Sequence, residues 1–164
     1  EMRLGLTALP EQGSYDGRVT IEGVRVLSAP ALAELLSAVS VVGLIEQMTG
    51  GGGILFTDVQ SDFILKPGRL TVKGGRAEGP SLGITMEGLY DSAAGRVDMQ
   101  GVVSPVYFIN ALGQVVSRRG EGLFGFTYTL TGDARAPAVG VNPLSIFTPG
   151  ALREIFRKAP AGDQ

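Results

Sequence analysis

The chain has 164 residues, of which 44% are hydrophobic and 18% are charged, and its formal net charge is −2. This composition fits one folded domain with an apolar core, and the weak charge gives no electrostatic basis for binding nucleic acid. Histidine and cysteine are both absent. Their absence excludes disulfides, thiolate or histidine metal sites, and catalytic triads or dyads that need either residue.

Alternation of apolar and polar residues predicts β-strands over most of the chain. The first clear alternation, Arg18 to Glu22, resumes at Val24 with its phase reversed beside Gly23, which predicts a β-bulge. Short turns such as Pro67-Gly68 predict antiparallel pairing of successive strands, and glycines inside the strands favour a strongly curved sheet. Further strands are expected at 59–65, 70–73, 82–87, 97–103, 124–130 and 139–141.

Three segments break this alternation. Residues 28–48 predict a helix with Ser28 as N-cap and Pro30 in its first turn. Its uncharged part is shorter than the about 20 residues that a membrane-spanning helix needs. Residues 106–116 predict a shorter helical or irregular segment, and 149–158 predict a terminal helix before a frayed tail at 159–164.

We therefore expect a single domain over residues 1–158 with an α+β fold. Its curved antiparallel sheet would form an elongated groove, covered or flanked by two or three helices. Glu1-Met2-Arg3 lacks the basic and apolar runs of a signal peptide. We interpret the chain as a piece of a longer protein, so the lack of a targeting segment carries little weight.

Few side chains are candidates for chemistry. Lys66 and Lys73 lie beside turn signals, where solvated lysines are expected. Asp58 and Asp62 would lie about 13 Å apart along one strand, which is too wide for a pair of glycosidase carboxylates. No carboxylates have the spacing of a calcium-binding loop. We expect no catalytic residue, metal or cofactor, although a lysine or carboxylate buried in a cleft would reopen an enzymatic function.

Four segments follow one another between Gly17 and Phe156: 17–26 with 29–36, 54–56 with 62–65 and 68–71, 77–84, and 139–144 before a helix that begins at Pro149-Gly150. Their order resembles the C-terminal region of AsmA-like envelope proteins of the YhdP/TamB type. The resemblance implies a long β-sheet groove with an apolar interior, in a periplasmic protein anchored in the inner membrane. It also implies a part in phospholipid transport between the two membranes or in outer-membrane homeostasis.

The implied partners are phospholipid or another acyl lipid, preceding repeats of the same full-length protein, and an outer-membrane protein. An apolar sheet face would bind acyl chains with about 25 cal/mol for each Å² removed from water. Arg153, Arg157 and Lys158 are weaker candidates for contact with anionic headgroups. The candidate lipid-binding residues are Val19, Ile21, Phe63, Leu65, Leu70, Val72, Ile84, Met86, Val97, Met99, Phe124, Phe126 and Tyr128.

An alternative function depends on the helix expected at 28–48. If this helix covers the apolar face, the candidate residues form a closed core and the domain is a cap. The chain would then be a non-catalytic structural or docking module, which caps a longer β-groove or binds an outer-membrane partner. Exposed sheet edges would serve such docking.

Overall fold

The computed structural model describes residues 1–27, 29–39, 52–105 and 125–142. Strands contain 68% of these residues and helix only 8%, and the sheet is not closed. The expected α+β class with two or three helices is therefore wrong, because the described chain is mainly β with one short helix. The segments expected at 106–116, 149–158 and 159–164 lie outside the described residues.

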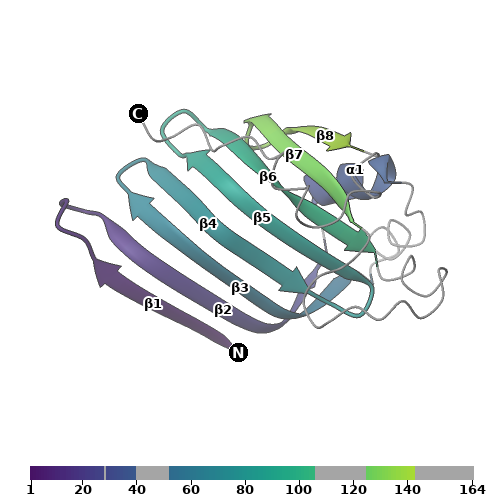
Figure 1. Ribbon diagram of the computed structural model, residues 1–164, viewed down its shortest axis with the longest axis horizontal. Helices are drawn as coiled ribbons and strands as arrows, with labels where there is room; N and C mark the ends of the chain where they lie inside the picture. The colour runs from purple at the N-terminus through teal and green to yellow at the C-terminus, as the bar shows by residue number, and fades with distance from the viewer. Residues whose placement is uncertain (28, 40–51, 106–124, 143–164) are drawn as a thin grey trace.

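Eight strands form one antiparallel sheet, and their order in space follows their order in the chain (Figure 1). The antiparallel pairing of successive strands, which the short turns predicted, is confirmed. The strands are β1 (Met2–Ala8), β2 (Tyr15–Val26), β3 (Ile54–Lys66), β4 (Arg69–Glu78), β5 (Leu82–Asp91), β6 (Arg96–Pro105), β7 (Phe126–Asp133) and β8 (Ala138–Asn142).

The helix α1 (Pro30–Ala38) is shorter than the helix expected over 28–48. Its N-cap is Ala29, which makes no side-chain capping bond, and Pro30 begins the first turn as predicted. The backbone N–H of Val39 donates to the carbonyl oxygen of Leu35 and closes the last turn. Ser28 and residues 40–51 lie outside the described residues. No helix among the described residues is long and apolar enough to cross a bilayer.

The register assigns the strand side chains to two faces, because directly paired residues point to the same side of a sheet. One side, the polar face, carries mainly threonine, amide and charged side chains. The other side, the apolar face, carries Met2, Leu4, Leu6, Ala8, Tyr15, Val19, Ile21, Val59, Phe63, Leu65, Leu70, Val72, Ala77, Ile84, Met86, Tyr90, Val97, Met99, Val103, Phe126, Tyr128, Leu130, Val139 and Val141.

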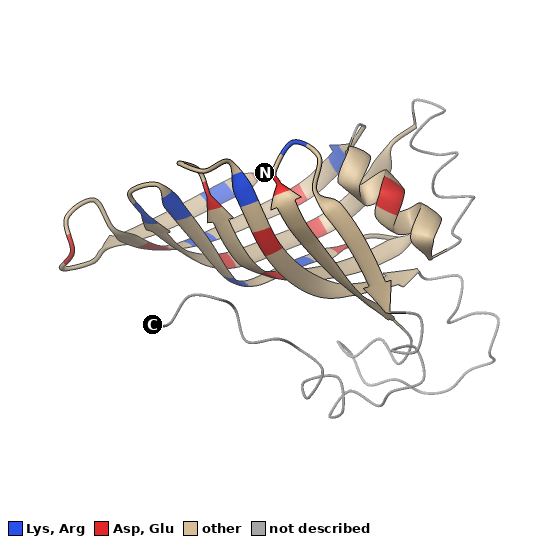
Figure 2. Ribbon diagram, turned by 90° about the horizontal axis from the view of Figure 1, so that it is seen from above, with Lys and Arg blue, Asp and Glu red and all other residues tan. Residues whose placement is uncertain are grey.

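The helix α1 lies on the apolar face, near β8 and at one end of the twisted sheet (Figure 2). Its buried side chains Leu35 and Leu36, with Val39, form the core together with the ends of several strands. Full burial of one such side chain stabilises the fold by about 1.5–3 kcal/mol. The strand residues of this core are Ile54, Phe56, Leu82, Val103, Phe126 and Tyr128.

The prediction of a β-bulge beside Gly23 is wrong. The pairs Glu22–Asp58 and Val24–Phe56 keep one register on both sides of it. Gly23 has a φ of 68°, in the left-handed region that favours glycine. The phase reversal therefore comes from the backbone conformation of Gly23. The register does shift in β4, where Lys73 is an extra residue relative to β3.

Candidate functional site

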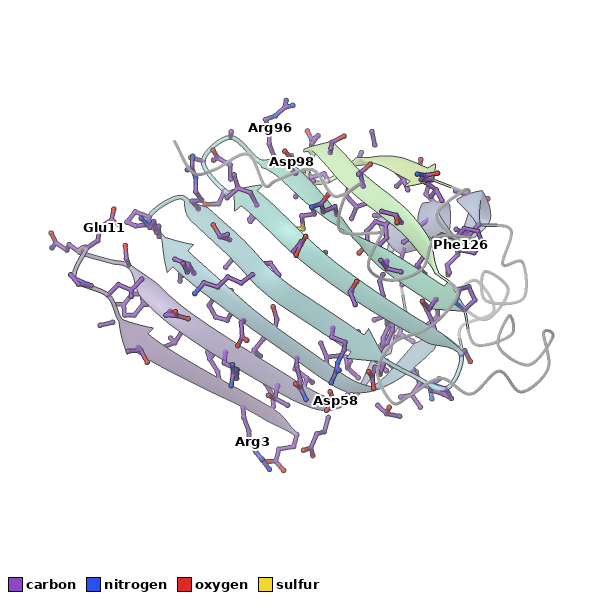
Figure 3. All side chains as sticks on the ribbon, in the orientation of Figure 1. Arg3, Glu11, Asp58, Arg96, Asp98 and Phe126 are labelled. Atoms are coloured by element: carbon purple, nitrogen blue, oxygen red, sulfur yellow. The ribbon has the colours of Figure 1, made fainter. Side chains whose placement is uncertain are left out.

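The register places every described candidate lipid-binding residue on the apolar face. Phe124, Arg153, Arg157 and Lys158 lie outside the described residues. The candidates on the face fall into two groups, because α1 covers only one end of it. Figure 3 shows Phe126 beside α1, and Arg3 and Glu11 far from the helix, on β1 and its connection to β2.

The first group lies in the core under or beside α1. Tyr128 is 1% exposed and Phe126 is 9% exposed, and Ile84 packs against the same cluster. Val72 is buried too, but it lies outside this cluster, next to Phe63 of the neighbouring strand. Phe126 and Tyr128 have almost no surface left for a ligand, so the part of the apolar face near α1 is a closed core.

The second group forms what we call the open patch, at the β1 side of the apolar face. Met2, Leu4 and Leu6 are 63%, 53% and 50% exposed, while Tyr15 and Leu65 are 37% and 39% exposed. None of the open patch belongs to the described core cluster around α1. The patch consists of these five residues and their half-buried neighbours Val19, Ile21, Phe63 and Leu70.

Four members of the open patch are not among the residues predicted from the sequence: Met2, Leu4, Leu6 and Tyr15. A signal was present, since Met2, Leu4 and Leu6 alternate with Arg3, Gly5 and Thr7. The remaining candidates Met86, Val97 and Met99 are half-buried on the same face, between the open patch and the core.

Gly17 keeps the open patch continuous across three strands. It pairs with Leu6 of β1 on one side and with Phe63 of β3 on the other. A Cβ atom at Gly17 would overlap the Phe63 ring and lie 3.0 Å from Cδ2 of Leu6. The ring therefore occupies the space above the backbone of Gly17, where an aromatic side chain shields a glycine in a strand.

A similar arrangement lies at the covered end of the face. The Tyr128 hydroxyl donates a hydrogen bond of 2.8 Å to the carbonyl oxygen of Thr85, and a Cβ at Gly101 would lie 2.9 Å from that hydroxyl. Burial raises the pKa of the Tyr128 phenol above its ordinary value. The neutral phenol thus acts as a structural donor in the core.

Ion pairs lie on the polar face. Arg18 donates two hydrogen bonds to Asp62, at 2.5 and 2.9 Å, and Lys73 donates one to Asp16 at 2.9 Å. The Arg18 guanidinium lowers the pKa of the Asp62 carboxyl by hydrogen bonding and by its charge. These exposed pairs stabilise the sheet only weakly. Within the described ranges no group of three acidic residues could hold a metal ion.

Comparison with known protein families, with curated proteins and with solved structures gave no match for this chain. The family resemblance drawn from the sequence therefore stays a prediction. The feature that points to a function is the amphipathic sheet, whose apolar face extends well beyond the described helix.

Proposed function

We propose that this chain binds the acyl chains of a phospholipid or a related lipid on the open patch. We further propose that it does so as a domain of an AsmA-like periplasmic protein anchored in the inner membrane. Such a protein would act in phospholipid transport between the membranes or in outer-membrane homeostasis. The observation that carries the proposal is the exposure of Met2, Leu4 and Leu6 beside other apolar side chains of the same face.

Contiguous exposed apolar side chains are costly in water and usually mark an interaction site. Each methylene that leaves water contributes about 0.8 kcal/mol, so an acyl chain gains affinity from contact area without directional bonds. The charged side chains Arg18, Asp62 and Lys73 project to the polar face, which leaves the open patch free of charge. A patch of this kind supports binding to acyl chains of different lengths.

The lipid would lie at the β1 side of the sheet and not at the end covered by α1. Leu35 and Leu36 already fill the space against Phe126 and Tyr128 there. Half-buried Met86 and Met99 line the continuation of the face toward that core. Methionine side chains adapt their shape to irregular apolar partners, which suits contact with lipid tails.

The test uses uptake of a fluorescent phospholipid by the purified chain, with native mass spectrometry of co-purified lipid. The variant Leu65→Asp places a charge in the open patch at a side chain that is already 39% exposed. The matched control is Gln60→Asp, an exposed residue of the same strand that projects to the polar face opposite Arg76. We expect Leu65→Asp to weaken uptake at least 10-fold while Gln60→Asp binds like the unaltered chain.

Lipid-free protein that takes up no fluorescent phospholipid would contradict the proposal. Equal uptake by Leu65→Asp and by Gln60→Asp would also contradict it, because the open patch would then not be the site. Circular dichroism and thermal unfolding of both variants must match those of the unaltered chain. The alternative is the docking module, which the closed core beside α1 favours.

A further inference from the structure

The exposure of apolar side chains falls along β3 from one end of the strand to the other. Leu65, beside the β3–β4 turn, is 39% exposed, whereas Phe56, near the start of the strand, is 4% exposed in the core cluster. Between them Phe63, Ser61 and Val59 are half-buried. The β3–β4 turn lies at the end of the sheet away from α1 (Figure 1). The apolar face therefore has an outer end that meets water and an inner end that α1 closes.

Two tyrosines belong to the outer end of the apolar face. The register pairs four residues in turn across β2, β3, β4 and β5, and we call them the outer row: Tyr15, Leu65, Leu70 and Tyr90. Tyrosine is common where an apolar surface meets water, because its ring is apolar and its hydroxyl forms hydrogen bonds. A lipid headgroup has to stay in water while its acyl chain leaves it. The outer row is therefore the place at which a headgroup would lie.

A second row of paired residues marks the inner end of the apolar face. Val59, Ala77 and Ile84 pair across β3, β4 and β5, and all three pack against the core cluster. We call them the inner row. Beyond it Leu36 of α1 is fully buried, so the side chains of the protein itself already occupy that space. An acyl chain that runs along the strands from the outer row must therefore end at the inner row.

We infer that the acyl chain lies along the strands, with its headgroup at the outer row and its terminal methyl at the inner row, so that α1 limits the length of the chain that is bound. Leu65 and Val59 are six residues apart, which corresponds to about 20 Å along a strand. A saturated chain with C–C bonds of about 1.5 Å advances about 1.25 Å per carbon, so the limit is about 16 carbons. This inference rests on the proposed lipid binding and adds the orientation of the lipid and its upper length.

The first test measures how affinity depends on the length of the acyl chain. Saturated lysophosphatidylcholines of ~10 to ~20 carbons compete with a fluorescent phospholipid for the purified protein, since each methylene that leaves water adds affinity. Each lipid is used below the concentration at which it forms micelles. An added methylene should lower the dissociation constant by about 2-fold if it is half removed from water and by about 4-fold if it is fully removed. Beyond about 16 carbons the added methylenes stay in water, and the dissociation constant should no longer fall.

A substitution at Ser61 should move this limit. Ser61 pairs with Gly75 on the apolar face, two residues nearer the outer row than Val59. Ser61→Phe would place an aromatic ring over Gly75 and stop the acyl chain about 7 Å earlier, which shortens the limit by about 5 carbons. The matched control is Gln60→Phe, which puts the same ring on the exposed polar face of the same strand. The control should keep the limit of the unaltered chain.

A second test measures the orientation of the lipid in the unaltered chain. Two photoreactive fatty acids carry a diazirine either next to the carboxylate or near the terminal methyl, and mass spectrometry locates their cross-links. We expect the first probe to label residues 65–70 and 88–91, at the outer end of the apolar face. The second probe should label residues 56–59 and 82–84, beside the core.

Affinity that keeps rising well past about 16 carbons overturns the inference, and so does an equal limit in Ser61→Phe and Gln60→Phe. Cross-links of both probes at the same residues, or in the reverse order, also overturn it. In each of these outcomes lipid still binds, so the proposed function stands without this orientation. If the chain takes up no lipid at all, the proposed function and the inference fail together. If Ser61→Phe does not fold, the photoreactive probes still decide the orientation.

Discussion

The hydroxyl of Tyr128 in β7 reaches across the backbone of Gly101 in β6 and donates a hydrogen bond to the carbonyl oxygen of Thr85 in β5, at 2.8 Å. One side chain thus joins three strands at the end of the sheet that α1 covers. The space for it exists only because Gly101 has no side chain. This contact allows two separate predictions.

Tyr128→Phe removes the donor and leaves a carbonyl oxygen without its partner in the core. We expect the free energy of unfolding to fall by about 1–3 kcal/mol, the usual cost of an unsatisfied buried group. Urea denaturation followed by circular dichroism measures this difference. Tyr15→Phe is the control, because the Tyr15 side chain is 37% exposed and should change stability little. Equal stabilities of the two variants would show that the bond to Thr85 contributes nothing.

The raised pKa of Tyr128 predicts a loss of stability at alkaline pH. In the unfolded chain the phenol loses its proton near pH 10, while the folded chain still holds it. Above about pH 10 the unfolded state therefore binds fewer protons than the folded state, and stability falls as the pH rises. Below about pH 10 the buried Tyr128 phenol makes its full contribution to the stability of the chain. Unfolding free energies of the unaltered chain and of Tyr128→Phe, measured from pH 8 to 11, should converge as the pH rises; parallel curves would contradict the prediction.

The sequence predicted which strand residues share a face better than it predicted which of them are covered. Alternation is a local property, so Phe126 and Tyr128 look the same as Leu65 in the sequence. Their different exposure depends on where α1 packs, and this is decided by contacts between distant parts of the chain. The sequence therefore indicated the apolar face but could not divide it into a core and an open patch.

Two errors have local causes. The phase reversal at Gly23 suggested an inserted residue, but a positive φ changes the side-chain direction without any insertion. The helix expected over 28–48 rested on apolar composition, whereas α1 ends at Ala38. In each case the same residue pattern is compatible with more than one backbone conformation.

The ion pair between Arg18 and Asp62 predicts an acid-side titration. The pKa of Asp62 is lowered chiefly by its hydrogen bonds to Arg18, so Arg18→Gln should raise that pKa toward its ordinary value. The stabilising effect of the pair is present above the unfolded pKa of about 3.9 and is lost as the pH falls through the lower folded value. NMR titration of the Asp62 carboxyl carbon measures its pKa in the unaltered chain and in Arg18→Gln. An unchanged Asp62 pKa in Arg18→Gln would show that the pair does not persist in solution.

The core contact of α1 predicts a large loss of stability on truncation. Leu36 is fully buried against strand residues of the apolar face. Leu36→Ala should lower the free energy of unfolding by about 2–5 kcal/mol, as expected for a cavity in a packed core. The control Leu27→Ala changes a side chain that is 60% exposed and should cost little. Thermal unfolding of the two variants distinguishes a packed α1 from a loosely attached one, for which the two losses would be equal.

The space above Gly17 predicts a substitution that disturbs the open patch without adding charge. A methyl group there would overlap the Phe63 ring and press on Leu6, so Gly17→Ala should destabilise the chain by about 1–3 kcal/mol, the range for overpacking. Gly74→Ala is the control, since a Cβ at Gly74 meets no atom within 4 Å. Because the displaced ring lies inside the open patch, Gly17→Ala should also weaken phospholipid uptake relative to Gly74→Ala. A loss of stability with full uptake would place the bound lipid away from Phe63.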